Sequence, residues 1–184
     1  IKKLTRDEIG ELTDALNGLL GRIREYQSEL VRLANTDGLT GILNRRTFFA
    51  KGEALLLKYE NNVYFVQIDL DHFKSVNDNY GHGIGDQVLE LVGRLLQGSI
   101  RTVGEREPDL VGRLGGEEFG ILLSTENLEQ ARSVSERLRA TLEKSEVDTG
   151  AKPLTITGSF GLAEAMPGES LDDLYHRADA ACYE

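Results

Sequence analysis

A sustained heptad of apolar residues near the start of the chain is the feature that most restricts how it can fold. The apolar positions recur at alternating spacings of three and four residues: Ile9, Leu12, Leu16, Leu19, Ile23, Tyr26, Leu30 and Leu33. A period of 3.5 is typical of a coiled-coil seam rather than of one face of a globular helix. We therefore expect residues 1–34 to form a helix that pairs with a second copy in a parallel dimer. The alternative is an amphipathic helix folded back on its own domain.

The charge of the chain divides at the same place. The 184 residues carry 21 basic and 31 acidic side chains, a formal charge of −10, yet residues 1–34 contain six of each. The excess negative charge therefore lies in residues 35–184, which we expect to be a separate domain. Such a charge argues against binding to a nucleic-acid polymer, which needs a basic face. A nucleotide substrate remains compatible if a divalent cation supplies positive charge.

The single cysteine and the apolar runs restrict the cellular setting. Cys182 alone can form no intrachain disulfide, which favours a reducing compartment. No apolar run reaches the ~18–20 residues that span a bilayer, and no secretory signal follows Ile1. We expect this chain to be a soluble, cytoplasmic fragment of a longer protein.

Residues 35–184 alternate between helical and strand patterns. Turn-forming residues precede a helix expected at 45–59, which Asn44 caps, and a near-continuous apolar strand expected at 63–70. The remaining elements are expected in the order helix, strand, strand, helix, strand, helix, at 86–98, 109–114, 119–124, 126–145, 154–164 and from 170 onwards. This order predicts an α+β fold with a βαββαβ core, in which helices pack on a central sheet.

Two acidic segments carry the strongest chemical signal. Asp69 and Asp71 end the first strand, and we expect that only one of the two carboxylates needs to face a site, where it and the carbonyl of Leu70 could form a hard-oxygen pair suited to Mg²⁺. The Gly-Gly-Glu-Glu segment at 115–118 predicts a hairpin turn between the next two strands. If this hairpin lies beside the first strand, Glu117 falls near Asp69, and together they could bind a divalent cation. Taken alone, each segment could be a solvated strand end or turn.

The glycine-rich stretch at 74–86 is expected to be a loop that opens a helix, and helix N-termini attract anions. Lys74 could neutralise phosphate, and Asn77 offers both a donor and an acceptor to a base edge. Asp86 is either a helix N-cap or an acceptor for the N1–H and N2–H groups of guanine. The stretch contains no P-loop sequence.

These segments together resemble the GGDEF family of diguanylate cyclases in order and spacing. The matching motifs cover the chain from about residue 36 to its end: Asp37–Arg46, Asp69–Lys74, Asn77-Asp78, Gly81-His82, Gly85-Asp86, Arg113–Phe119 and Ala178–Tyr183. The resemblance implies condensation of two GTP molecules into cyclic di-GMP and two pyrophosphates. It also implies a fold similar to the palm of adenylyl cyclases and polymerases.

The resemblance assigns roles to individual residues of this chain. Asp69, the Leu70 carbonyl and Glu117 would bind Mg²⁺, with Mn²⁺ as a possible substitute. Glu117 would also be the base for the 3′-hydroxyl, and Lys74 would stabilise charge on the phosphates. Guanine would be read by Asn77 and Asp86, and His82 lies in the same substrate segment.

A second site is implied by Arg106 and Asp109, which have the form of the inhibitory RxxD site of the family. There they would bind cyclic di-GMP, with Arg137 of the following helix contributing, and would give product inhibition. A surface salt bridge in a polar loop is the alternative. Two further hypotheses for the domain are a cyclic di-GMP receptor with weak or no catalysis and a cyclase of another nucleotide, which Asp86 argues against.

Residues 7–17 are similar to the second helix of a HAMP signalling module, which relays conformational change from a membrane receptor. This resemblance implies that the longer parent protein is anchored in the bacterial inner membrane. The two-fold symmetric product implied by the GGDEF resemblance needs two half-sites, so we expect a homodimer formed through the N-terminal helix and the catalytic faces.

Overall fold

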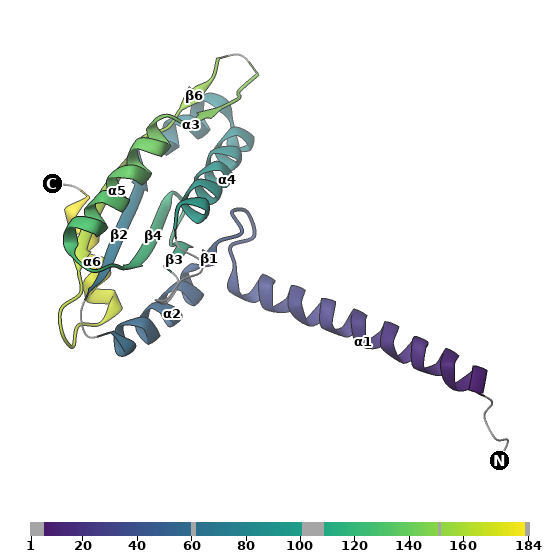
Figure 1. The fold of residues 1–184 in the computed structure, drawn as a ribbon. Helices are drawn as coiled ribbons and strands as arrows, with labels where there is room; N and C mark the ends of the chain where they lie inside the picture. Colours follow the sequence, from purple (N-terminus) through teal and green to yellow (C-terminus); the bar gives the residue numbers. More distant parts are fainter. Residues whose placement is uncertain (1–5, 60–61, 101–108, 151, 183–184) are drawn as a thin grey trace. The chain divides into compact units, whose positions relative to one another are not determined.

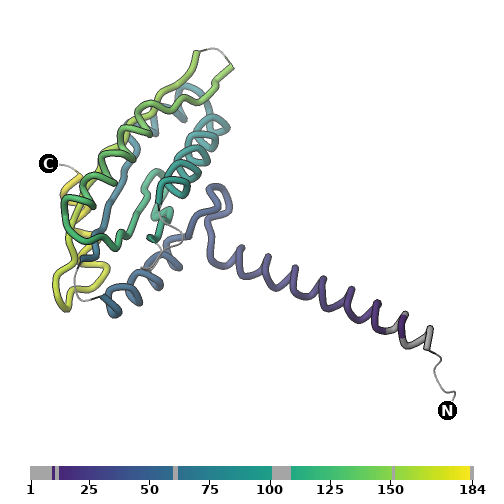
Figure 2. Tube along the Cα trace, viewed as in Figure 1, coloured from purple at the N-terminus to yellow at the C-terminus, as the bar shows by residue number. Residues whose placement is uncertain are grey.

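The computed structural model describes residues 6–59, 62–100, 109–150 and 152–182, and it divides into two units, Ile1–Asn35 and Thr36–Glu184. The described residues of the first unit form one helix, α1 (Arg6–Asn35), drawn in purple in Figure 1 and, where it is not grey, in Figure 2. Six heptad residues of α1 are between 49% and 70% exposed: Leu16, Leu19, Ile23, Tyr26, Leu30 and Leu33. Within the described parts of the chain, no helix is long and apolar enough to cross a bilayer.

The second unit is built on a five-stranded sheet in the order β1-β3-β4-β2-β7. The strands are β1 (Leu43–Asn44), β2 (Val63–Leu70), β3 (Leu110–Arg113), β4 (Glu118–Ser124) and β7 (Gly158–Glu164). β1 is parallel to β3, and every other pairing is antiparallel. Strand β2 lies between β4 and β7 and is buried along almost its whole length, as its apolar run predicts. The α+β class and the βαββαβ core are therefore confirmed.

Helices cover both faces of the sheet (Figure 1). α2 (Arg45–Lys58) and α6 (Leu171–Ala181) contribute to one apolar cluster, which includes Phe65 of β2. α4 (His82–Ser99) and α5 (Leu128–Glu143) contribute to the other cluster, which includes Ile68 of β2. A small second sheet pairs β5 (Glu146–Val147) with β6 (Leu154–Thr155).

Side-chain caps fix where three of these helices begin. Asn44 accepts a hydrogen bond from the backbone N–H of Thr47 at the start of α2, as the sequence predicts. Asn127 and Ser170 cap α5 and α6 in the same way. Because Asn44 also belongs to β1, this cap fixes the point where the chain leaves the sheet edge and enters the helix.

The glycine-rich stretch at 74–86 was wrongly expected to be a loop. Most of it is helical: α3 (Phe73–Tyr80) contains Lys74 and Asn77, and α4 begins at His82. The break between the helices is a single residue, Gly81, whose φ of +83° favours glycine. Phe73 and Val76 are buried three residues apart and hold α3 against the core, which outweighs the poor helix propensity of its polar residues. Asp86 therefore lies inside a helix and is not an N-cap.

The strand expected at 154–164 is two strands in two different sheets. β6 ends at Thr155, and β7 begins only at Gly158. Between them, Ile156 is buried in the core, and the carbonyl of Thr157 accepts a hydrogen bond from the backbone N–H of Asp71. The chain thus changes sheets at these two residues, next to the end of β2.

Candidate active site at the end of β2

The two acidic segments lie side by side at the end of the central strand. In the antiparallel register of β2 and β4, Asp69 is opposite Glu118. The backbone N–H of Leu70 donates to the carbonyl of Glu117 at 3.3 Å. The hairpin therefore pairs with the first strand, which was the condition for bringing Glu117 near Asp69.

Asp71, just beyond the end of β2, has hydrogen-bond partners of its own. Its two carboxylate oxygens accept hydrogen bonds from the hydroxyls of Thr157, at 2.7 Å, and Ser159, at 2.8 Å. It is therefore bonded to the β7 side, whereas Asp69 lies next to the β4 turn. The strand β2 ends at Leu70, and the hydrogen bonds beyond this point give Asp71 a structural role that Asp69 does not have.

Arg113 stabilises the turn of the hairpin through hydrogen bonds to its backbone. Its guanidinium donates to the carbonyl of Gly115 at 3.1 Å and to that of Gly116 at 2.7 Å. The N–H groups of Leu114 and Gly115 both point to the carbonyl of Glu118, which closes the turn. The backbone just before the acidic residues is thus fixed at several points.

Asp37 in turn holds Arg113, with an N···O distance of 3.2 Å. The same Asp37 carboxylate accepts hydrogen bonds from the backbone N–H and the hydroxyl of Thr40, at 2.9 and 2.7 Å. Burial alone would raise the pKa of Asp37, but the Thr40 hydrogen bonds and the Arg113 charge outweigh it and lower the pKa. The turn at residues 37–40 is therefore an ionic support for the acidic hairpin.

A second arginine reaches the hairpin from α2. The guanidinium of Arg45 donates to the carbonyl of Leu114 at 3.4 Å. Its carbon Cζ lies 4.9 Å from the ring centroid of Phe49 and 5.3 Å from that of Tyr175. These cation–π contacts keep the guanidinium in place.

Asp69 lies in a strongly negative environment. Burial is the largest cause that raises its pKa above the usual value. Four carboxylates raise it further: Glu117, Glu118, Asp71 and Asp179. No hydrogen bond from the described residues offsets this, so a cation is the group that would stabilise the ionised carboxylate.

The donor set suits a hard divalent cation whose remaining ligands are water or phosphate oxygens. Within the described ranges, no group of three or more His, Cys, Asp and Glu side chains is arranged to hold a metal ion. Asp69, Glu117 and the Leu70 carbonyl offer two carboxylates and one neutral oxygen. Mg²⁺ characteristically takes one or two protein carboxylates and completes its shell with water and phosphate oxygens. The residues present fit such an ion.

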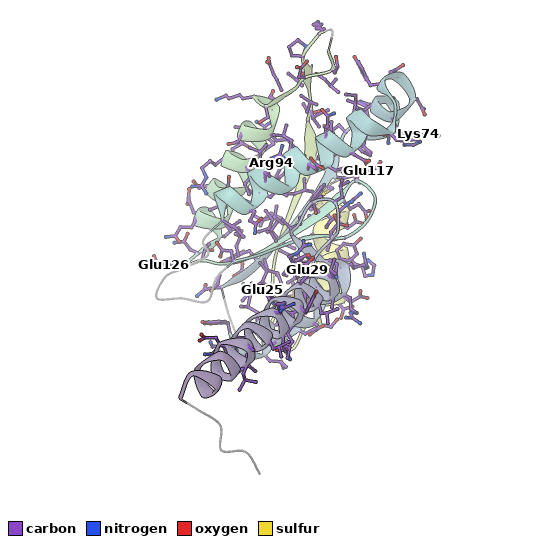
Figure 3. All side chains as sticks on the ribbon, turned by 90° about the vertical axis from the view of Figure 1, so that its right-hand side faces the viewer. Glu25, Glu29, Lys74, Arg94, Glu117 and Glu126 are labelled. Atoms are coloured by element: carbon purple, nitrogen blue, oxygen red, sulfur yellow. The ribbon has the colours of Figure 1, made fainter. Side chains whose placement is uncertain are left out.

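The residues expected to bind the nucleotide are carried by α3 and α4. Lys74 is exposed on the first turn of α3, and Figure 3 labels it together with Glu117. The side chain of Asn77 lies against Gly85, where a Cβ would collide with its amide oxygen. His82 and Asp86 are exposed in the first two turns of α4. Gly85 is thus needed so that Asn77 can lie between the two helices.

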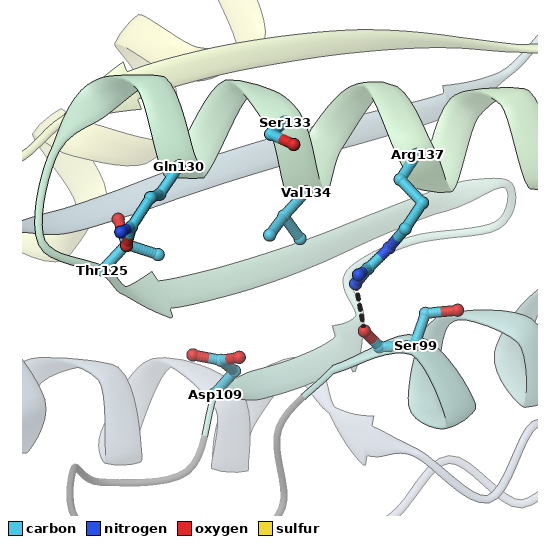
Figure 4. Close-up of a pocket in the computed structure, with 7 residues that line it drawn as sticks. All are labelled: Ser99, Asp109, Thr125, Gln130, Ser133, Val134 and Arg137. Atoms are coloured by element: carbon cyan, nitrogen blue, oxygen red, sulfur yellow. Dashed lines mark hydrogen bonds between the residues drawn. The ribbon is translucent and has the colours of Figure 1, made fainter.

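The expected inhibitory site coincides with a cavity of about 300 Å³ on the α5 side of the sheet (Figure 4). Asp109 lines it and accepts a hydrogen bond from the backbone N–H of Ser124 at 3.3 Å. Arg137 reaches in from α5 and donates to the carbonyl of Ser99 at 2.8 Å. Asp109 and Arg137 therefore line one cavity, whereas Arg106 lies outside the described residues.

Sequence reasoning gave no role to Asp37, Arg45 or Arg113. Each lies within a motif, but its partner is distant in the chain, 76 residues away for the pair Asp37 and Arg113. The available signal was a basic residue, Arg113, two positions before two glycines and two acids, since such a turn has carbonyls that need donors.

Comparison with known proteins decides the family. A family model described as "Diguanylate cyclase, GGDEF domain" matches residues 34–184. The chain belongs to the GGDEF family. Diguanylate cyclase VdcA of Vibrio cholerae is 34% identical over 197 residues, which cover 100% of this chain and 56% of VdcA. Diguanylate cyclase DgcM of Escherichia coli is 36% identical over 163 residues, which cover 87% of this chain and 38% of DgcM. The chain thus spans about half or less of the length of these relatives.

Solved GGDEF structures share the fold. The coiled coil and GGDEF domain of DgcB from Caulobacter crescentus, in complex with c-di-GMP, has a TM-score of 0.80 and 30% identity, covering 95% of this chain and 91% of that one. Diguanylate cyclase SiaD of Pseudomonas aeruginosa, in complex with its activator SiaC, has a TM-score of 0.75 and 32% identity, covering 96% and 67%. The expected GGDEF membership is confirmed, and the HAMP-like character of α1 stays a prediction.

Proposed function

We propose that this GGDEF domain is a divalent-metal-dependent diguanylate cyclase that condenses two GTP molecules into cyclic di-GMP and two pyrophosphates. The observation that carries the proposal is the pairing of β2 with β4, which brings Asp69 and the Glu117 backbone together from segments about 50 residues apart. The curated relatives named as diguanylate cyclases support the same activity. An intact acidic turn favours catalysis over a receptor that only binds.

Asp69, Glu117 and the Leu70 carbonyl are the proposed ligands of Mg²⁺, for which Mn²⁺ can substitute. Bound there, the ion would neutralise the triphosphate and polarise the phosphorus centre. Lys74, exposed at the start of α3, is the proposed contact for phosphate oxygens. The support for this assignment is that an acidic site can accept a triphosphate only with a cation present.

Asn77 and Asp86 are the proposed readers of guanine, with His82 beside them. Asn77 has both a donor and an acceptor, and the carboxylate of Asp86 can accept from the N1–H and N2–H groups. The ring nitrogen N1 of adenine is itself an acceptor and would face this carboxylate unfavourably. We therefore assign GTP rather than ATP as the substrate, and competition between the two nucleotides tests the assignment.

In the proposed reaction Glu117 takes the proton of a 3′-hydroxyl, and the resulting oxygen attacks the α-phosphorus of the other GTP. A new O–P bond forms, the bond from the α-phosphorus to the bridging oxygen breaks, and pyrophosphate leaves with the electron pair. Phosphoryl transfer of this kind depends on positioning and charge stabilisation more than on covalent help from the protein. Arg113 and Asp37 contribute by fixing the turn that carries Glu117.

The product has two-fold symmetry, so two domains that face each other must each supply one GTP. We propose that α1 brings them together as a parallel coiled coil, because its apolar stripe is exposed over six heptad positions. The HAMP-like resemblance of residues 7–17 supports a parent protein anchored in a membrane, with this chain on its cytoplasmic side.

The test is incubation with GTP and Mg²⁺, followed by mass analysis of the products. Wild type is expected to form cyclic di-GMP, whereas Asp69→Asn and Glu117→Gln each lose activity by several orders of magnitude. Asp71→Asn is the matched control, because this carboxylate is bonded to Thr157 and Ser159 instead. Unchanged turnover in Asp69→Asn would exclude the proposed metal site.

The cavity between β3 and α5 is proposed as a product-binding regulatory site. Its support is that Asp109 and Arg137 line one cavity, where a guanidinium and a carboxylate could recognise guanine. Arg137→Ala is expected to weaken cyclic di-GMP binding in calorimetry and to raise the product concentration that halves activity. If wild type binds cyclic di-GMP without forming it, the receptor function is the correct one.

A further inference from the structure

Gln67, in the middle of β2, is a buried polar residue that the proposed function does not use. Its side chain is fully buried, and neither its amide nitrogen nor its amide oxygen has a hydrogen-bond partner among the described residues. Most buried amides in proteins are paired, because burying one without partners is unfavourable. The otherwise apolar run of β2 offers no packing reason for a glutamine here. The residue therefore calls for a specific role.

The position of Gln67 places it beside Asp69. Side chains alternate along a strand, so residues 67 and 69 share one face, with their Cα atoms roughly 7 Å apart. The strand register puts Gly120 of β4 on one side of Gln67 and Gly161 of β7 on the other. Neither glycine has a side chain that could contact the amide. The next side chain on this face toward the end of β2 is that of Asp69.

The end of α6 covers this position. A Cβ at Gly161 would collide with the carbonyl oxygen of Ala178 and with Cys182. The Cys182 thiol already donates to the backbone carbonyl of Gln67 at 3.5 Å. Backbone of α6 and the Cys182 thiol therefore bound the position of Gln67 on the β7 side.

Asp69 needs a hydrogen-bond donor on this side. No hydrogen bond from a described residue reaches its carboxylate. Asp71, by contrast, has two hydroxyl donors. The NH₂ group of Gln67 is the neutral donor that lies next along the same face of β2. A single buried water can bridge such a gap when it finds two or more polar partners.

We propose that Gln67 is a positioning residue for Asp69, which it orients through one buried water that bonds to the carboxylate oxygen turned away from the divalent ion. Groups that hold a metal ligand from behind fix its orientation and strengthen binding. The inference rests on the proposed function, because the divalent ion belongs to that proposal. It adds a residue that no GGDEF motif quoted above contains.

The test compares Gln67→Met with Gln67→Asn. Methionine keeps the length and fills the core but removes the amide, whereas asparagine keeps an amide and leaves room for water. Binding of Mn²⁺ in the presence of a non-hydrolysable GTP analogue is measured by electron paramagnetic resonance, and the melting temperature is measured without the ion. Phe65→Leu is the control, since it disturbs packing on the same face of β2 without changing a polar group.

We expect Gln67→Met to melt at or above the wild-type temperature yet to bind Mn²⁺ about 10- to 100-fold more weakly. Gln67→Asn should melt lower but bind Mn²⁺ more tightly than Gln67→Met. A residue that only fills the core would give the opposite order of affinities, or affinities within twofold of wild type, and either result overturns the inference. If Asp69→Asn leaves Mn²⁺ binding intact, the proposed metal site itself fails, which is a separate result.

Discussion

At the residue scale, the ion pair between Asp37 and Arg113 connects the start of the domain to the acidic turn. Asp37 fixes Arg113, and Arg113 fixes the carbonyls of Gly115 and Gly116. None of these groups is expected to touch the nucleotide. Their effect on activity is therefore indirect, through the position of Glu117, and their effect on stability can be measured separately.

Asp37→Asn is expected to destabilise the domain by about 1–2 kcal/mol at pH 7, because hydrogen bonds to a charged group are lost. The folded state lowers the pKa of Asp37, so the unfolded chain binds more protons near pH 4. The stabilisation is complete above the unfolded pKa and is lost as the pH falls through the lower folded pKa. The free energy of unfolding, measured by denaturant titration between pH 2.5 and 7, should therefore fall less steeply with decreasing pH in Asp37→Asn than in wild type.

The exposed Asp78 provides the control for this pH dependence. It has no partner among the residues that the structure describes. Asp78→Asn should leave both the free energy of unfolding and its decrease at acid pH as in wild type. Equal effects of the two substitutions would show that the loss of stability at low pH depends on overall charge and not on the bond to Arg113.

At the scale of elements, the contact between α2 and the sheet depends on two glycines that face each other on adjacent strands. In the register of β3 and β4, Gly112 is opposite Gly120. A Cβ at Gly112 would lie 2.8 Å from both Cβ and Cδ2 of Phe48. The fully buried ring of Phe48 therefore packs directly on the strand backbone, close to the hairpin that carries the acids.

Gly112→Ala is expected to lower the free energy of unfolding by about 1–3 kcal/mol, because Phe48 cannot move away within a packed core. Gly98→Ala, in α4, is the matched substitution: a Cβ there meets no atom within 4 Å. It should instead stabilise by up to about 1 kcal/mol through helix propensity. Denaturant titration of both variants measures the difference, and equal signs would contradict the packing argument.

The exposed stripe of α1 gives a second prediction at this scale. Ile23→Asp, in the middle of the stripe, is expected to dissociate the helices, because a charge at a coiled-coil seam position is unfavourable. Turnover at sub-micromolar protein should fall on the order of 10- to 100-fold as the effective concentration of the second half-site is lost, and should recover at high protein concentration. Glu25→Gln changes an exposed residue outside the stripe, labelled in Figure 3. This variant should neither dissociate the helices nor lower turnover. Equal mass by light scattering for both variants would contradict the prediction.

Local sequence patterns predicted the elements that depend on local forces. The strand at Val63–Leu70 follows from a continuous apolar run, and the start of α2 follows from the cap at Asn44. α3 was missed because tertiary burial of Phe73 and Val76, not propensity, makes it helical. The two-residue strand β1 was missed because it exists only by pairing with β3, which is distant in the chain.

The candidate site was predictable to the same extent. The proximity of Glu117 to Asp69 follows once the hairpin pairs with the first strand, and the separate hydrogen bonds of Asp71 are consistent with only one of the two aspartates facing the site. The support by Asp37 and Arg45 was not predictable, because each bond joins segments whose relative position only the folded sheet determines. The bonds of Arg113 to the carbonyls of Gly115 and Gly116 are local and had a signal in the sequence.

At the scale of the whole molecule, the proposed reaction requires two intact half-sites in one dimer. Each of the two new O–P bonds in the product uses the Glu117 of one domain. A dimer of one wild-type and one Glu117→Gln chain therefore has one working half-site and can form only the first bond, which leaves a linear dinucleotide. In a catalyst that worked as a monomer, the inactive chain would not change the product that the wild-type chain forms.

Mixing wild type with Glu117→Gln in equal amounts, with time for exchange of subunits, distinguishes these cases. Random pairing leaves about one quarter of the dimers with two wild-type chains, so cyclic di-GMP formation should fall to about one quarter of that of the undiluted enzyme. Independent monomers would retain about one half. The linear dinucleotide should appear in the mixture and not with wild type alone, which mass analysis of the same samples detects. Adding Ile23→Asp to the Glu117→Gln chain should prevent its pairing and restore the value of one half, because the inactive chain then no longer captures wild-type partners.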